Sequence, residues 1–154
     1  MPTPNRERVL YWLTWPAALW IAYIFLWYEQ YKLTGHPGSV WLFQTLADWL
    51  FIGGYEKPFR LSVAIAEIAA SVLVVLPRTR MWGAALSFGI ISGAIFFHVF
   101  SPVGIDPFDD GAQLFKEAVA VWFASAFILV VMRNEVRAVL GRIGLLPTPV
   151  AATH

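Results

Sequence analysis

The chain contains no cysteine and few charged side chains, and both shortages narrow its class. Without cysteine it cannot form disulfides, thiolate metal sites or a cysteine nucleophile. Only 14% of its 154 residues are charged, whereas 58% are hydrophobic. A soluble domain of this length has no interior large enough to bury so much apolar surface. The composition therefore indicates a membrane protein.

Motifs for common chemistries are also missing. The sequence has no glycine-rich nucleotide loop, no serine elbow and no basic patch for nucleic acid. A b-type haem usually takes two axial histidines, but His98 is the only histidine inside an apolar run, since His36 lies in a loop and His154 ends the chain. We therefore expect no metal site, no intrinsic cofactor and no nucleic-acid partner, and an accessory subunit rather than a self-contained enzyme.

Four long apolar runs dominate the sequence, and each is long enough to cross a hydrocarbon core about 30 Å thick as a helix. They cover residues 9–28, 60–76, 82–100 and 114–132. The first run follows "NRER" and has no small-x-small cleavage site near its end, so we interpret it as a retained span. The pattern predicts an all-α membrane protein whose four-transmembrane-helix bundle occupies residues 9–132.

The arginines predict the orientation of these spans. If the chain crosses the membrane four times, one side collects Arg6, Arg8, Arg78, Arg80, Arg133, Arg137 and Arg142. The positive-inside rule places this side in the cytoplasm. Residues 1–8 are then a cytoplasmic N-terminal segment, residues 133–154 are a cytoplasmic tail, and the two longer loops lie outside.

The outer loop between the first and second spans contains a helical pattern of its own. In "GSVWLFQTLADWLF", residues 38–51, large apolar residues alternate with polar ones at helical spacing after a Gly-Ser start. The segment is too short to span, so it predicts a short amphipathic helix on the outer face of the bundle. The end of the tail, "LLPTPVAATH", has no periodicity, and we expect it to be flexible unless a partner holds it.

Glu67 is the most informative polar residue, because a charge near the bilayer centre costs about 2.5–3.5 kcal/mol on insertion scales. At 100° per residue it shares a helix face with small side chains, which predicts that it points into the bundle. Under the expected topology, several ionisable residues lie in the outer half of the membrane. We expect one polar, outward-facing cavity to collect Glu29, Lys32, Glu67, His98, Lys116 and Glu117.

A structural interpretation of the same residues stays open. The charges could pair with one another and with loop backbone and so only fix the helix register. His98 lies near the helix-breaking "SP" and fits a hydrogen-bonded imidazole at the interface, and Lys116 fits a side chain that extends to the headgroups. "GIISG" places Gly89 and Gly93 at the spacing that lets helices approach closely, which suits packing inside the bundle or an interface with a partner protein.

Several segments resemble, in order, the signature of the DoxX family of small bacterial membrane proteins. They are "YKLTGHPGSVWLFQTL", the glutamate of "VAIAEIAASVLVVLPRT", "GAIFFHVF" followed by "GI", and "DGAQLFKEAVAV". The resemblance covers about residues 28–131 and implies a four-helix membrane bundle in the bacterial inner (plasma) membrane. It carries over Glu29 with Lys32, Glu67, His98, and Asp110 with Gly111; the chain departs from the family pattern at "SPVGIDPFDD" and at Lys116–Glu117.

Two functions follow as hypotheses. The DoxX resemblance implies a membrane redox context, so the first is a redox-associated subunit whose outer cavity binds quinone or another small apolar ligand. Glu67 and His98 would then hydrogen-bond the ligand. The second is a non-catalytic structural or assembly subunit, which would contact other subunits of a membrane complex, or further copies of itself, through Gly89 and Gly93. In both cases the bilayer surrounds the spans.

Overall fold

The structure is a computed structural model that describes residues 4–143 and residue 145. Over these residues the regular secondary structure is helical, in the order α1 (Pro4–Thr34), α2 (Pro37–Trp49), α3 (Glu56–Val75), α4 (Arg80–Phe100), α5 (Gln113–Val131) and α6 (Arg133–Arg142). Of the described helices, α1, α3, α4 and α5 are long and apolar enough to cross a membrane. The predicted all-α fold with four membrane-length helices is confirmed.

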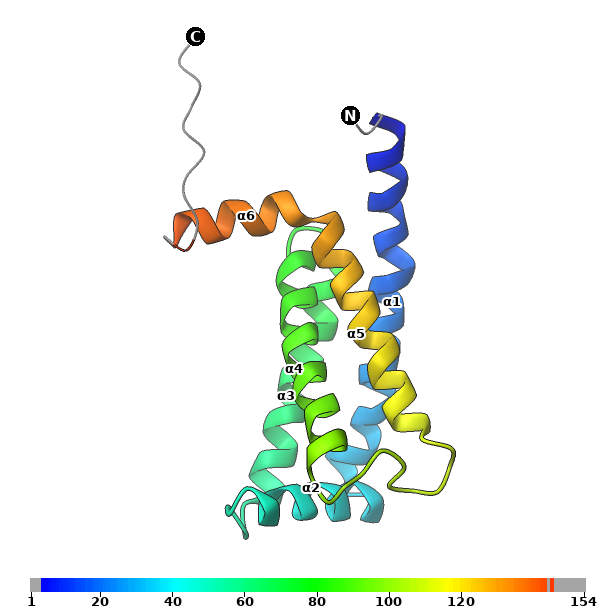
Figure 1. Ribbon diagram of the computed structural model, residues 1–154, viewed down its shortest axis with the longest axis vertical. Coiled ribbons are helices and arrows are strands. Elements are labelled where there is room, and N and C mark those ends of the chain that lie inside the picture. Colours follow the sequence, from blue (N-terminus) through cyan, green and yellow to red (C-terminus); the bar gives the residue numbers. More distant parts are fainter. Residues whose placement is uncertain (1–3, 144, 146–154) are drawn as a thin grey trace.

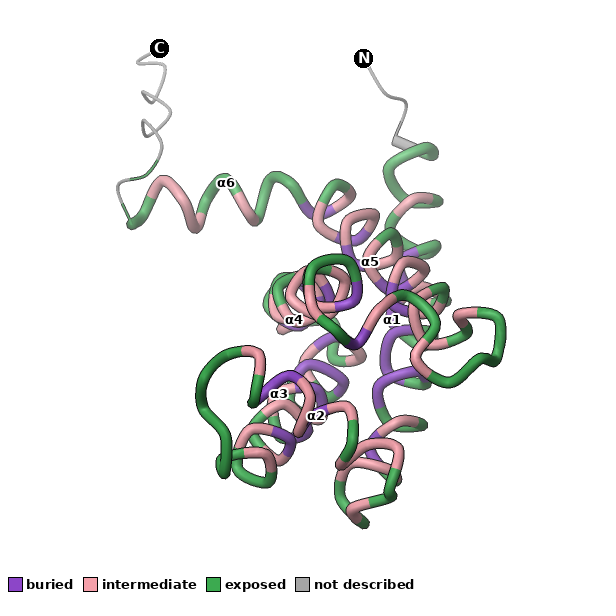
Figure 2. The backbone as a smooth tube through the Cα atoms, turned by 60° about the horizontal axis from the view of Figure 1, so that its bottom comes forward, coloured by how far each residue is buried: buried purple, intermediate pink, exposed green. Residues whose placement is uncertain are grey.

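The four long helices form a closed ring. Helix α1 packs against α3 and α5, and α4 packs against the same two neighbours, so the order around the bundle is α1–α3–α4–α5. In Figure 1 they run along the long axis, with α2 lying across one end. We call this the α2 end, and the opposite end, where α1 begins and α5 finishes, the α6 end. Figure 2 shows that buried residues gather on the sides where these helices face one another.

Helix α1 is longer than the predicted span. It continues past residue 28 to Thr34 and stops at Gly35, whose φ of +70° suits glycine better than other residues. Glu29 and Lys32 therefore lie within the helix, three residues apart on one face, and not in a loop.

Helix α2 confirms the predicted amphipathic helix, with a different start. It begins at Pro37, and the N-cap is His36, whose Nδ1 accepts a hydrogen bond of 3.2 Å from the Gly38 N–H. The expected Gly-Ser start was therefore wrong by one residue, because proline suits the first position of a helix. The buried face of α2 consists of Phe43, Leu46 and Ala47.

Helices α3 and α4 approach most closely near the α6 end, at Gly83. A Cβ atom at this position would lie 2.5 Å from the Val74 Cα and 2.6 Å from the Leu73 carbonyl carbon. No side chain other than hydrogen fits there, so the backbones can touch only because residue 83 is glycine. A Cβ at Gly89 or Gly93, further along α4, would meet nothing within 4 Å. Of the two uses suggested for this pair, close packing inside the bundle therefore finds no support at these positions.

Arg80 connects α4 to α3 and α1 at the α6 end of the bundle. It is fully buried, and its guanidinium donates to the carbonyl oxygens of Val74 (3.2 Å) and Val75 (3.3 Å) and to the Thr14 hydroxyl (2.9 Å). It also lies over the Trp15 ring, 4.0 Å from the centroid. The α3 carbonyls that have no partner within their own helix are thereby satisfied by a side chain of α4. From the sequence, Arg80 was expected only to contribute to the orientation of the spans.

The predicted tail begins with a helix that sequence analysis missed. Helix α6, Arg133–Arg142, turns away from the axis of α5 in Figure 1. Its half-buried Val136 and Val139 pack against the core, while its arginines are exposed on the outer side. Most of the segment predicted to be flexible, residues 146–154, lies outside the described residues.

Candidate functional site: a cavity at the α2 end

A cavity of about 730 Å³ occupies the half of the bundle next to α2. All four long helices contribute to its wall, α2 covers part of it, and the loop between α4 and α5 completes it. The wall is mainly aromatic and aliphatic, from residues such as Ile24, Phe25, Leu42, Phe59, Ile90 and Phe97. Its volume lies in the range of about 300–1,000 Å³ that is usual for small-molecule sites.

An ion-pair cluster lies at one side of this cavity. The Lys32 ammonium is 3.0 Å from Glu29 Oε1 and 2.5 Å from Glu67 Oε2, so it joins two carboxylates from α1 and α3. All three side chains are largely buried, and both Lys32 and Glu67 line the cavity. The structure therefore pairs Lys32 with Glu67, two of the residues expected to share one polar cavity.

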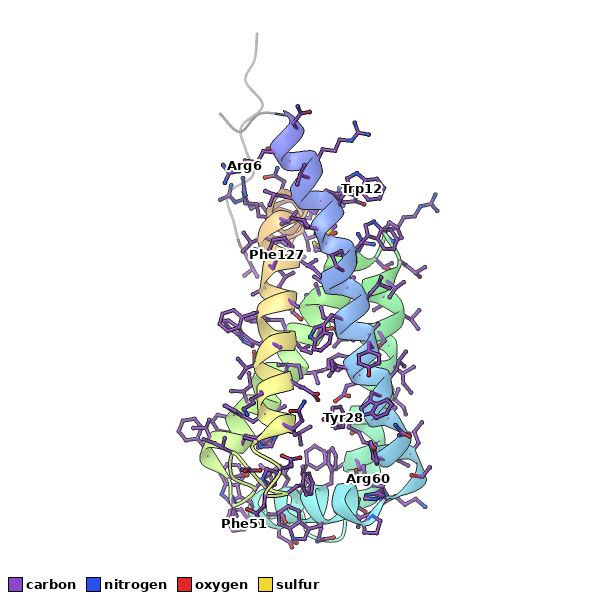
Figure 3. All side chains as sticks on the ribbon, turned by 90° about the vertical axis from the view of Figure 1, so that its right-hand side faces the viewer. Arg6, Trp12, Tyr28, Phe51, Arg60 and Phe127 are labelled. Atoms are coloured by element: carbon purple, nitrogen blue, oxygen red, sulfur yellow. The ribbon has the colours of Figure 1, made fainter. Side chains whose placement is uncertain are left out.

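Arg60 hydrogen-bonds to the backbone of the ion-pair cluster. It is buried and donates through Nε to Glu56 Oε1 at 2.5 Å and through Nη1 to the backbone carbonyl of Lys32. Figure 3 shows Arg60 near the α2 end, below Tyr28. The contact ties the last turn of α1 to the first turn of α3. Arg60 had no predicted role; the signal that could have identified one is Glu56, which lies four residues earlier on the same helix face.

A second polar pair connects α1 to α5. Tyr28 donates its hydroxyl to Glu117 Oε2 at 2.5 Å, and Gln113 Nε2 donates to Glu117 Oε1 at 2.5 Å. Both Tyr28 and Glu117 line the cavity. The structure thus places Glu117 in the predicted cavity but with a phenol as its partner. Tyr28 was missed because a tyrosine at the end of a membrane span usually indicates an interface anchor.

His98 lies at the cavity wall but does not touch Glu67 in any hydrogen bond of the described residues. Its Nδ1 is 2.6 Å from the carbonyl oxygen of Gly104, and its ring meets Phe115 edge-on with centroids 5.8 Å apart. Because a carbonyl only accepts, Nδ1 must carry the proton in this bond. His98 therefore holds the α4–α5 loop and is hydrogen-bonded, as the structural interpretation expected.

Lys116 and the glycine pair differ from their expected positions. Lys116 is exposed and does not line the cavity, although it follows one turn after Ala112 at the start of α5. Gly89 and Gly93 do line the cavity. The residues singled out for a partner interface thus border the same space as the candidate ligand residues.

The loop that leads into α5 is shaped by carboxylates. Asp106 accepts hydrogen bonds from the backbone N–H groups of Asp110 (3.1 Å) and Gly111 (3.2 Å), and Asp110 accepts from the Gln113 N–H at 2.9 Å. The N–H groups of Ala112, then Asp110 and Gly111, hold the pKa of Asp106 below its ordinary value. In the described chain these carboxylates organise the loop, and no group of three candidate metal ligands occurs there.

One atom of the cluster has no partner. Glu29 Oε2 is buried, and within the described residues nothing donates to it.

A comparison with protein-family models, with curated proteins and with solved structures finds no match. The function must therefore be argued from the cavity itself.

Proposed function

We propose that this protein binds a small apolar ring compound of the quinone type in the cavity at the α2 end. It would act as a redox-associated subunit of a membrane assembly, in the manner of the DoxX family that its sequence resembles. The observation that carries the proposal is the composition of the cavity wall. Apolar side chains surround most of about 730 Å³, and the few polar groups converge from α1, α3, α4 and α5. Ligand sites combine these same features.

The polar groups are suited to hold the oxygen atoms of a ring. Glu67 approaches the cavity from α3 and Glu117 from α5, the two neighbours of α1, which carries their partners Lys32 and Tyr28. A flat ring between the two carboxylates could therefore be hydrogen-bonded at two edges. Aromatic residues such as Phe25 and Phe97 would contact its faces. The redox context comes from the DoxX resemblance alone, which is an argument by analogy.

The orientation belongs to the same proposal. Arg78 and Arg80 lie at the α6 end, together with the arginines of α6 and the start of α1. Under the positive-inside rule, the α6 end would face the cytoplasm and the cavity would lie in the outer half of the membrane. That this membrane is a bacterial inner membrane is what the DoxX resemblance implies.

A cavity-filling variant tests the binding function. Ala66 lines the cavity and is half-buried, so Ala66→Phe should fill it and abolish binding of an added short-chain benzoquinone, measured by quenching of tryptophan fluorescence in detergent. Ala69, one turn away on α3, is exposed and does not line the cavity, and Ala69→Phe is the matched control. A wild-type protein that binds no quinone, but purifies with a stoichiometric protein partner, would replace this proposal by the assembly-subunit function.

A further inference from the structure

We propose that the cavity recognises a hydroxyl donor, so that it binds the hydroquinone form of its ligand more tightly than the quinone form. This inference rests on the proposed function and specifies its ligand. It follows from which hydrogen-bonding capacities remain free at the buried polar groups of the cavity wall.

The cationic group is already engaged. Two of the three donors of the Lys32 ammonium are directed at Glu29 and Glu67. A carboxylate accepts at about four lone-pair sites, and Glu67 receives one bond from the side chain of Lys32. The Lys32–Glu67 pair therefore retains more acceptor than donor capacity toward a ligand.

Tyr28 and His98 also offer a ligand acceptors rather than donors. Tyr28 uses its hydroxyl proton on Glu117, which leaves the phenol oxygen as an acceptor. The Nδ1 proton of His98 is used on Gly104, so Nε2 of the neutral imidazole can only accept. Apart from the third proton of Lys32, the donor groups that are left on the wall belong to the exposed Trp27 and to Tyr31, His36 and Ser39. The last three lie in the last turn of α1 and at the start of α2, next to the exposed side chain of His36.

A ligand hydroxyl complements this surplus of acceptors, whereas a quinone carbonyl has only acceptors to offer. One hydrogen bond to a charged group contributes about 1.5–3 kcal/mol, so we expect a preference of at least about tenfold for the hydroquinone. Since the reduced form is held more tightly, the midpoint potential of the bound couple should rise, by about 30 mV for each tenfold preference in a two-electron couple.

The experiment compares three ligands that share one ring and one tail: the quinone, the hydroquinone and the hydroquinone dimethyl ether. Wild-type protein in lipid nanodiscs should bind the hydroquinone about tenfold more tightly than either of the others. Glu67→Gln should bring the three affinities close together, because the amide replaces an acceptor by a donor. Glu56→Gln removes a carboxylate from the same helix but outside the cavity wall, and should keep the wild-type preference.

The outcomes separate the two proposals. If wild-type protein binds none of the three ligands, the proposed function fails and this inference fails with it. If it binds the quinone or the dimethyl ether as tightly as the hydroquinone, the function stands and donor recognition is refuted. The wild-type comparison decides this even if Glu67→Gln does not fold.

A different observation supports a second inference, about the ligand's tail. Four small residues line the cavity from the adjacent helices α3 and α4: Ser62, Ala66, Gly89 and Gly93. Ser62 and Gly89 are exposed, and a Cβ at either glycine would meet nothing within 4 Å. From Arg80, Gly89 lies roughly 14 Å and Gly93 roughly 20 Å along α4, at a rise of ~1.5 Å per residue, which is within the membrane-length part of the helix.

We infer that an apolar tail on the ligand leaves the cavity between α3 and α4 and continues into the lipid. The helices touch at Gly83 and leave space at Gly89 and Gly93, so the opening is confined to the half of the groove next to α2. The proposed occupant is the isoprenoid or alkyl tail of the cavity's own ligand, because the cavity and the opening form one continuous space.

Gly93→Leu tests the tail path with ligands of one ring and two tail lengths. Because Gly93 lines the cavity, the readout is the difference between the two ligands: the variant should lose about tenfold more affinity for the long-tailed ligand than for the tail-free ring. Gly141→Leu, in a helix and equally unobstructed but outside the cavity, is the control. The tail path is refuted if Gly93→Leu loses the same affinity for both ligands, or if it loses none for the long-tailed ligand. If the wild type binds neither ligand, the proposed function is refuted instead.

Discussion

Replacing each of three glycines in α4 by alanine should have opposite effects on stability, depending on where α4 meets α3. At Gly83 the new methyl group would lie 2.5 Å from the Val74 Cα. The obstacle is backbone, which cannot move aside by a side-chain rotation. The two helices must separate, and overpacking of this kind costs about 1–3 kcal/mol. We expect Gly83→Ala to reach the upper end of that range, because the contact involves the main chain of both helices.

At Gly89 and Gly93 the same substitution meets no neighbour within 4 Å. Alanine is then favoured over glycine by the smaller loss of backbone freedom in a helix, which is worth about 0.5–1 kcal/mol. Gly89→Ala and Gly93→Ala should therefore be neutral or slightly stabilising. The difference between the two classes should be about 2–4 kcal/mol when these terms are combined.

The measurement is reversible unfolding in mixed micelles with increasing SDS, followed by circular dichroism. The three variants share one helix and one chemical change, so differences in expression or detergent binding should largely cancel. The reasoning fails if Gly83→Ala unfolds at the wild-type SDS fraction, or if Gly89→Ala and Gly93→Ala are the destabilised variants. The second result would mean that the GxxxG spacing, and not the Gly83 crossing, brings α4 against its neighbour.

The remaining predictions concern other parts of the molecule. Arg80→Met should destabilise the fold by about 3 kcal/mol, because it leaves two helix-end carbonyls without a donor, whereas Met at the exposed Arg78 should change the SDS midpoint little. A reporter that is active only in the periplasm should stay inactive when fused after His154, and activity there would contradict the proposed orientation. The pKa of Asp106 is lowered by loop N–H groups, so its contribution to loop order should be complete above the ordinary pKa of about 3.9 and disappear as pH falls through the lowered value. Hydrogen exchange of the α4–α5 loop should show this loss in the wild type and no further loss in Asp106→Asn.

The spans and the inward direction of Glu67 could be predicted because both depend on properties local to the chain. The length of an apolar run decides whether a helix can cross the membrane, and the 100° repeat decides which residues share a face. Lys32 was among the residues expected to share a cavity with Glu67, since both were placed in the outer half of adjacent spans, and the structure pairs them. Fold class and one ion pair followed from these two rules.

The other contacts depend on distances between helices, which no spacing in the sequence encodes. Tyr28 meets Glu117 across 89 positions, and Arg80 meets Thr14 across 66. The two glycines with the expected motif spacing line a cavity, whereas the single Gly83 marks the helix crossing. Two helices cross where the ridges of one surface fit the grooves of the other. A glycine in the sequence therefore marks a possible crossing point, and only the folded structure shows which glycine is used.

The charges at the α2 end argue against a purely structural role for the cluster. Arg60 and Glu56 form a pair with one cation and one anion, the arrangement expected where charges only hold helices together. The neighbouring cluster places two carboxylates around one ammonium and leaves Glu29 Oε2 buried without a donor. A buried acceptor left unsatisfied costs about 1–3 kcal/mol, which a network serving stability alone would avoid. Glu29 does not line the cavity, so Glu67 is the carboxylate of this cluster that a ligand could reach, and a bound hydroxyl is the kind of group that would complement it.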